Sequence, residues 1–272
     1  MDYVAVTDHD SIEGALRLLE ARPESAGRII IGEEVETRFP DTGQRLHVNV
    51  FGLDEATHRE VQRLRPNVHD LVAFLRRRGL LHVLNHPFWS YRFQTRPRAY
   101  VEEILDLFDH FEAGNSTMPP GHAETAEAML RYGAALGLRK TAVAGSDAHV
   151  PDHVASSFTI ASGDTAPEWL ASVARGECSY AASHIGFPSL LSHVYRAVGA
   201  YYRDLASAEG RKGMAPINFL AAAAFLPGAV LGVPALLACL NEIKQRGVLV
   251  LTRRGLERIA TAAAPAPLES LD

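Results

Sequence analysis

The stretch Val4-Ala5-Val6-Thr7-Asp8-His9-Asp10 places a short apolar run directly before a polar cluster. Three further apolar runs end in the same way, at residues 32–34 (Gly-Glu-Glu), 86–87 (His-Pro) and 145–149 (Gly-Ser-Asp-Ala-His). Short apolar runs that stop at polar residues are typical of buried strands. Imidazole and carboxylate groups at the ends of several strands are how a barrel assembles a metal site. The four clusters therefore predict one metal centre.

Segments with strand character alternate with segments of helical periodicity over the first two thirds of the chain. The predicted strands are residues 3–7, 28–34, 46–51, 81–85, 110–113 and 141–144. The predicted helices are residues 12–21, 55–64, 68–78, 101–107, 122–136 and 166–175. A turn at residues 41–43 (Asp-Thr-Gly) predicts that residues 35–39 pair with residues 46–51. This alternation favours an α/β architecture with a mostly parallel sheet.

Composition narrows the class of partner and the compartment. The 272 residues are 47% hydrophobic and carry a net charge of −5, so no basic footprint points to nucleic acid as the main partner. Metals and phosphorylated small molecules remain as candidate partners. The two cysteines, Cys178 and Cys239, form no disulfide framework and no Cys-type zinc site. With no basic segment before the first apolar run, a signal peptide is not indicated, and a cytoplasmic protein is expected.

The composition changes after residue 186. We expect one domain over residues 1–186 and a helical C-terminal extension over residues 187–272. Within the extension, residues 214–241 contain neither a charge nor a His. This segment is long enough to span a membrane, so membrane association through it is one expectation. A kinked, buried helical hairpin and a segment lying on a membrane surface are the alternatives.

Six side chains are the candidate metal ligands. Asp147 and His149 are two residues apart, so in an extended segment both point to the same side. His9 lies between Asp8 and Asp10, which are candidate catalytic groups that support the ligands from behind. The full set of predicted ligands is His9, Glu34, His47, His86, Asp147 and His149. Mixed nitrogen and oxygen ligands suit manganese, zinc or iron.

Spacing alone leaves several of these choices open. Glu33 and Glu36 compete with Glu34, although strand alternation puts Glu34 and Glu36 on one face and Glu33 on the other. His82 competes with His86, and the proline that follows His86 favours an extended backbone there. A lone His on a strand, such as His47, is more often an ordinary polar residue than a ligand.

Taken together, the motifs resemble the PHP (polymerase and histidinol phosphatase) family of metal-dependent phosphoesterases. The matching stretches, in chain order, are residues 4–10, 31–37, 46–53, 85–88, 111–115 and 144–149. The resemblance selects Glu34 through the family's Gly-x-Glu segment and His86 through its His-Pro motif. It implies a distorted (β/α)7 TIM-like barrel with two or three divalent metals at the carboxyl ends of the strands. The implied reaction is hydrolysis of a phosphate ester by metal-activated water.

The family pattern also begins with a His-x-His strand and a nearby Asp, and this sequence contains neither. The resemblance therefore implies an N-terminally incomplete barrel, and we expect a mis-called or truncated gene start, with activity impaired by the loss. The alternative function is a non-catalytic PHP-fold module, regulatory or membrane-associated. An amidohydrolase-like barrel is disfavoured because no lysine stands at a predicted strand end: the lysines are Lys140, Lys212 and Lys244.

Overall fold

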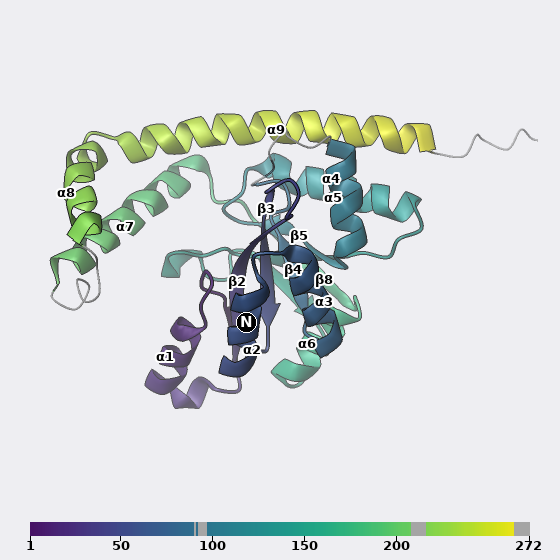
Figure 1. Cartoon of the computed structure of the whole chain (residues 1–272), viewed down its shortest axis with the longest axis horizontal. Coiled ribbons are helices and arrows are strands. Elements are labelled where there is room, and N and C mark those ends of the chain that lie inside the picture. The colour runs from purple at the N-terminus through teal and green to yellow at the C-terminus, as the bar shows by residue number, and fades with distance from the viewer. Residues whose placement is uncertain (90, 92–96, 208–215, 264–272) are drawn as a thin grey trace, which may run out of the picture.

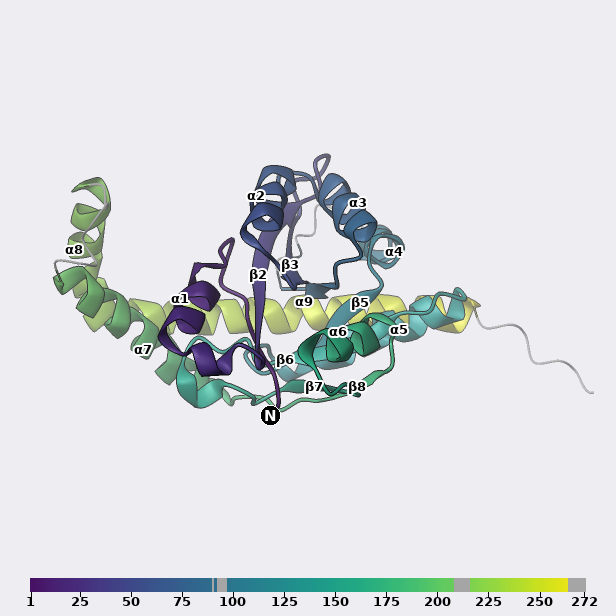
Figure 2. The same ribbon diagram turned by 90° about the horizontal axis from the view of Figure 1, so that it is seen from below.

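The computed structural model describes residues 1–89, 91, 97–207 and 216–263. Its centre is a curled six-stranded sheet that forms half of a barrel (Figures 1 and 2). The strands lie in chain order: β1 (Val4–Val6), β2 (Ile29–Arg38), β3 (Arg45–Phe51), β4 (His82–Asn85), β5 (His110–Asn115) and β6 (Thr141–Gly145). This confirms the predicted α/β class and the TIM-like curvature. Within the described residues the sheet stays open, because β1 and β6 do not pair.

The strand directions place the ends of β1, β4 and β6 on one side of the sheet. β1 pairs with β2 in parallel, and β4, β5 and β6 form a parallel set. β3 runs antiparallel to both of its neighbours, β2 and β4, so it alone is reversed. The sheet is thus mostly parallel, as predicted, and the predicted hairpin between residues 35–39 and 46–51 is confirmed. β2 continues past Glu34 to Arg38, because β3 takes over as its partner where β1 ends.

Helices cover the sheet, and local sequence explains most of their bounds. They are α1 (Glu13–Ala21), α2 (Glu55–Leu64), α3 (Val68–Arg78), α4 (Pro97–Leu107), α5 (Pro120–Ala135) and α6 (Ala166–Ala174), with two single-turn 3₁₀ helices at Pro23–Ser25 and Pro151–His153. Asp54 begins α2 by accepting the Thr57 amide at 2.7 Å, and Asn67 begins α3 in the same way. Gly79 ends α3 in the left-handed conformation, at φ 64°.

Two features lie outside the predicted pattern. β7 (Phe158–Ala161) and β8 (Cys178–Ala181) form a separate antiparallel pair that packs beside β6. The Thr159 hydroxyl ties this pair to β6 by bonding both backbone groups of Ala144. The pair was not predicted, because its residues are mostly half-exposed and show no buried apolar run. The main core lies between the sheet and the helices and includes the fully buried Phe111, Leu84 and Leu71.

Three helices make up the C-terminal part: α7 (Phe187–Ala206), α8 (Pro216–Val230) and α9 (Val233–Ala263). Figure 1 shows α9 lying along one end of the sheet domain, with α7 and α8 projecting at its side. Most of the uncharged segment, residues 214–241, is divided between α8 and α9 at Gly232, whose φ is 93°. Residues 214 and 215 lie outside the described residues.

Where the structure describes them, no single helix has both the length and the apolar character of a membrane span. The length and apolar character of a span are reached only by two helical segments together, Leu220–Val230 and Val233–Leu256. The chain bends by 78° at the break between them.

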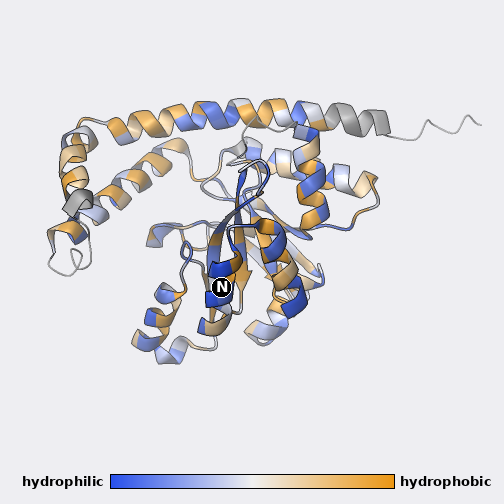
Figure 3. Ribbon diagram, viewed as in Figure 1, coloured by the Kyte–Doolittle hydropathy of each residue, from blue (hydrophilic) through white to orange (hydrophobic). Residues whose placement is uncertain are grey.

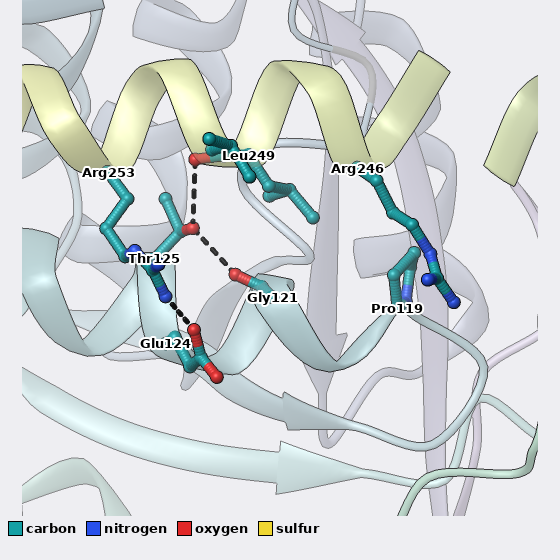
Figure 4. A pocket seen from close by; sticks show the side chains of 8 residues that line it. Pro119, Gly121, Glu124, Thr125, Arg246, Leu249 and Arg253 are labelled. Carbon is teal, nitrogen blue, oxygen red and sulfur yellow. Dashed lines mark hydrogen bonds and ion pairs between the residues drawn. The ribbon is translucent and has the colours of Figure 1, made fainter. Parts of the chain in front are cut away.

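α9 is fixed to the sheet domain through α5 (Figure 4). The Thr125 hydroxyl of α5 lies 3.5 Å from the Leu249 carbonyl of α9, and Arg253 of α9 forms an ion pair with Glu124 of α5. Val248, Leu249 and Leu256 are buried in this contact and belong to the main core. One face of α9 is therefore part of the fold rather than an appendage to it.

Candidate metal centre

Backbone pairing brings the first two predicted ligands together. His9 follows β1, and an isolated parallel bridge aligns it with Glu34 on β2. The Glu34 amide donates to the Asp8 carbonyl at 3.1 Å, and the Asp10 amide donates to the Glu34 carbonyl at 3.0 Å. This places the His9 ring nitrogen Nε2 3.5 Å from the Glu34 carboxylate. The register of β1 against β2 therefore places His9 beside Glu34, and this register cannot be read directly from the sequence.

The Glu34 carboxylate is the hub of the site. Its Oε1 atom lies 3.1 Å from His47 Nδ1, 3.1 Å from His86 Nε2 and 3.0 Å from the Asn85 side-chain amide. Burial works against the charge of Glu34, but the hydrogen bonds from His47 and His86 outweigh it and hold its pKa well below the usual range. A buried carboxylate that stays ionised among imidazoles can bind a cation without first losing a proton.

The size of this group fits a metal ion. One donor atom each from His9, Glu34 and His47 lies within 4.8 Å of the other two. Two ligands bound at about 2.1 Å to one ion can be at most about 4.2 Å apart, so small side-chain movements close the set. Neutral imidazole and carboxylate are the donors that zinc, manganese and iron accept. The residues present therefore fit the predicted divalent metal.

Asp147 and His149 form a second group on the loop after β6. Asp147 Oδ2 accepts the Thr117 hydroxyl at 2.6 Å and lies 3.3 Å from the Asn115 amide. His149 Nδ1 lies 3.0 Å from the Asp147 carbonyl oxygen and 3.7 Å from its carboxylate. Asn115 also donates to Glu112 at 2.9 Å, and both residues lie on β5, within the stretch 111–115 that resembles the family pattern. The carboxylate of Asp147 is thus held in place from the side of β5.

All six predicted ligands line one cavity of about 270 Å³. They come from five strands or the loops that follow them: β1, β2, β3, β4 and β6. His9, Glu34, His47 and His86 form one cluster of direct contacts, whereas Asp147 and His149 line the same cavity from the loop after β6. The structure therefore brings the whole predicted set together.

None of the competing residues lines the cavity. Glu33 is fully buried on the opposite face of β2, where it binds His58 and Gln62 at 3.0 and 2.8 Å. His82 bonds the Leu80 carbonyl and does not line the cavity. Glu36 shares the Glu34 face and lies 3.7 Å from His47 Nε2, but it also forms an ion pair with Arg45 and does not line the cavity. The geometry thus favours Glu34 and His86.

Asp8 and Asp10, the predicted catalytic groups, do not line the cavity. The Asp10 carboxylate accepts the Glu36 amide at 3.0 Å and binds Arg65 at 2.6 Å, which fixes the loop that carries His9. The Asp8 carboxylate lies against Gly14 of α1, where there is no room for a Cβ. The structure gives Asp10 a positioning role, and a catalytic role for either residue stays a prediction.

Three site residues have an unusual backbone. Asp10, His86 and Asp147 adopt φ values of 52°, 24° and 49°, on the left-handed side that non-glycine residues rarely occupy. The extended backbone expected for His86 before Pro87 is therefore wrong. The His86 amide donates a 2.9 Å hydrogen bond to the buried Glu112 carboxylate. This bond overrides the backbone preference of a residue that precedes proline. Strain of this kind persists where the surroundings over-determine it, as they often do at functional sites.

Several cavity residues were not anticipated. The Trp89 ring lies 5.3 Å from the His47 ring and 5.5 Å from the His86 ring. The only local signal was its place directly after His-Pro-Phe. Leu190 and Val194 of α7, and Asn241, Glu242 and Gln245 of α9, complete the wall. The sequence of α9 contains no local signal that one face of this helix lines a polar cavity.

Metal affinity should rise with pH because His86 must lose a proton to bind. Burial favours the neutral ring, but the hydrogen bond to Glu34 and the charge of Glu112 outweigh it and raise the pKa of His86 to about 9. Below about pH 9 the ion that binds His86 displaces one proton, so its affinity should increase about tenfold per pH unit. Calorimetric titration of the chelator-treated chain with Mn²⁺ between about pH 6 and 8 measures this slope.

A matched variant separates this proton from others in the protein. His86→Ala should bind Mn²⁺ more weakly and with a clearly shallower pH dependence. An unchanged slope in His86→Ala would mean that another group supplies the proton.

No protein-family model and no curated protein matches the sequence. Several chains of solved structures resemble it distantly, two of them as follows. One is a protein from Bifidobacterium adolescentis, provisionally described as a metal-dependent phosphoesterase, with 14% identity, a TM-score of 0.42 and coverage of 55% of this chain and 78% of the other. The second is an amidohydrolase from Chromobacterium violaceum with bound sulfate and no metal, with 18% identity, a TM-score of 0.40 and coverage of 56% and 79%. At these scores the function must be argued from the site itself.

Proposed function

We propose that this chain is a metal-dependent phosphoesterase that hydrolyses a phosphorylated small molecule. The observation that carries the proposal is the convergence of four imidazoles and two carboxylates on one cavity, with the ionised Glu34 at the hub. Their order and sequence contexts are those of the PHP motifs described above. Carboxylate and imidazole ligands without cysteine suit the hydrolytic metals rather than a thiolate site.

His9, Glu34 and His47 would hold one divalent ion, and His86, which lies beside Glu34, would complete the centre with Asp147 and His149. Such ions lower the pKa of bound water and offset the charge of a phosphate ester. The chain's own contribution is to fix the ligands. Asn85 orients the Glu34 carboxylate, and Thr117 with Asn115 orients Asp147, so these groups need little rearrangement.

The cavity wall indicates the class of substrate. The described lining residues include no Lys or Arg, so the phosphate would depend on the metals for its charge balance. The rest of the substrate would face Trp89 and the polar side chains Asn241, Glu242 and Gln245. A volume of about 270 Å³ suits a small, polar alcohol as leaving group rather than a polynucleotide.

The test is metal-dependent hydrolysis by the full chain. Chelator-treated protein, reloaded separately with Mn²⁺, Zn²⁺ or Fe²⁺, is assayed with p-nitrophenyl phosphate and bis(p-nitrophenyl) phosphate. We expect activity with at least one metal and its loss with excess chelator. His86→Ala and Asp147→Ala should each lower turnover by at least about a hundredfold.

His69→Ala is the matched control, because His69 is exposed on α3 and lies outside the cavity. It should keep full activity. A chain that binds metal but hydrolyses neither ester would support the non-catalytic PHP-fold module instead.

Glu242 should select for substrates with a positively charged leaving group. It is mostly buried at the cavity wall and bonds Arg246 at 2.9 Å. A charge-assisted hydrogen bond to an ammonium group is about twice as strong as a neutral one, so Glu242→Gln should raise KM for phosphoethanolamine about tenfold. KM for glycerol phosphate should change much less. Equal changes for both esters would contradict a contact between Glu242 and the leaving group.

A further inference from the structure

α9 has two apolar faces, and the sheet domain covers only one of them. Val248, Leu249 and Leu256 are buried against the domain. On the outward side, Leu236, Leu240 and Ile243 follow one another at helical spacing and are more than half exposed, with Ile243 at 69%. A helix that is apolar all round is normally buried on all sides. The outward face of α9 therefore lacks a partner among the described residues.

α8 is apolar on all sides, and, among its described residues, the chain covers only the stripe that carries the buried Ala222 and Ala229. It contains no charged residue, and the large side chains Leu220, Phe225, Leu226 and Val230 point out on different sides and are all exposed, Val230 at 78%. Figure 3 shows the apolar colouring continuing from α8 into the start of α9. A partner protein would cover one stripe of such a helix. Lipid can cover all the remaining sides of a helix at once, so the distribution of the exposed side chains favours lipid.

Among the α9 side chains that the structure describes, the exposed charges beside this surface are basic. Lys244 and Arg254 are exposed on α9, whereas Glu242 is turned to the cavity of the candidate metal centre. Basic side chains at the border of an apolar helical face are typical of segments that lie on anionic bilayers. The remainder of the chain is acidic overall, so this basic border is a local feature.

The dimensions favour insertion from one side. At about 1.5 Å per residue, the 15 residues of α8 extend about 22 Å, less than the hydrocarbon thickness of about 30 Å. α9 turns away from α8 at the 78° bend and stays attached to α5. We propose that α8 inserts into one leaflet of an anionic membrane while the outward face of α9 lies on its surface. This attachment is independent of the reaction at the metal centre.

The experiment is co-sedimentation of the full chain with two kinds of vesicle, phosphatidylcholine alone and phosphatidylcholine mixed with phosphatidylglycerol. We expect binding to the mixed vesicles and about tenfold weaker binding to the neutral ones. The double variant Leu226→Glu/Leu231→Glu and the single variant Ile243→Glu should each weaken binding about tenfold or more. All three positions are exposed, so circular dichroism should show an unchanged fold.

Leu136→Glu and Ile160→Glu are matched controls, because both residues are exposed on the sheet domain. They should bind vesicles like the unaltered chain. The proposal fails if the unaltered chain stays in the supernatant with both vesicles, or if the controls lose as much binding. It also fails if sedimentation velocity shows a dimer that Leu226→Glu/Leu231→Glu dissociates and that does not bind vesicles, since the occupant would then be a second copy.

Discussion

Glu34→Gln should abolish metal binding and lower phosphoesterase turnover by at least about a hundredfold. Glu34 is the one carboxylate that His9, His47 and His86 share, all within 3.5 Å. An amide of the same shape has no charge to offer a cation, and its NH₂ group would face ring nitrogens that now donate to an oxygen. Elemental analysis of the purified variant and the p-nitrophenyl phosphate assay measure the two effects.

Glu36→Gln is the control that makes this result specific. Glu36 lies two residues away on the same face of β2 and competes with Glu34 in the sequence. Its carboxylate is partly exposed, is bound to Arg45 and lies 3.7 Å from only one proposed ligand, His47, whereas that of Glu34 is shared by three. It should keep its metal content and most of its turnover. Loss of metal from Glu36→Gln with retention in Glu34→Gln would mean that the wrong glutamate has been assigned.

Glu112→Gln should stabilise the metal-free protein at pH values above 7. Burial raises the pKa of Glu112 to about 7, although the charge of nearby His86 opposes this. Between the unfolded value of about 4.5 and this value, the folded state holds a proton that the unfolded state has lost. Stability contributed by this group is therefore lost as the pH rises through that window. Removing the charge should add on the order of 2 kcal/mol to the free energy of unfolding near pH 8.

Urea unfolding with a chelator present, at about pH 5 and about pH 8, measures the difference. The variant should gain at the higher pH and change little at the lower one. Glu60→Gln, an exposed carboxylate on α2 that pairs with Arg63, should not reproduce this pattern. If Glu112→Gln were instead less stable near pH 8, the ionised Glu112 would be a net stabilising partner of His86.

The helices and strands were largely predictable because their signals are local. α2 and α3 have the predicted bounds, since Asp54 and Asn67 supply caps and Gly79 supplies a stop within the same few residues. The hairpin of β2 and β3 follows from its turn and alternation. β7 and β8 were missed because a pair of short strands on the surface carries no buried apolar run.

The ligand types were also visible in the sequence, but their arrangement was not. The backbone of His86 contradicts its local preference because a buried carboxylate 26 residues away, Glu112, holds its amide. Likewise, the break between α8 and α9 at Gly232 divides what the sequence shows as one uncharged run. The contribution of α9 to the cavity depends on its packing against α5, a contact between segments more than 100 residues apart.

The sequence by itself determined the α/β class, most element bounds and the set of six candidate ligands, because periodicity, caps and residue type act over a few neighbouring positions. Only the tertiary structure decided which glutamate lies among the imidazoles and which helix closes the cavity. It also decided which apolar face stays uncovered. These depend on sheet register and on contacts between distant segments, whose free energy no short stretch of sequence contains.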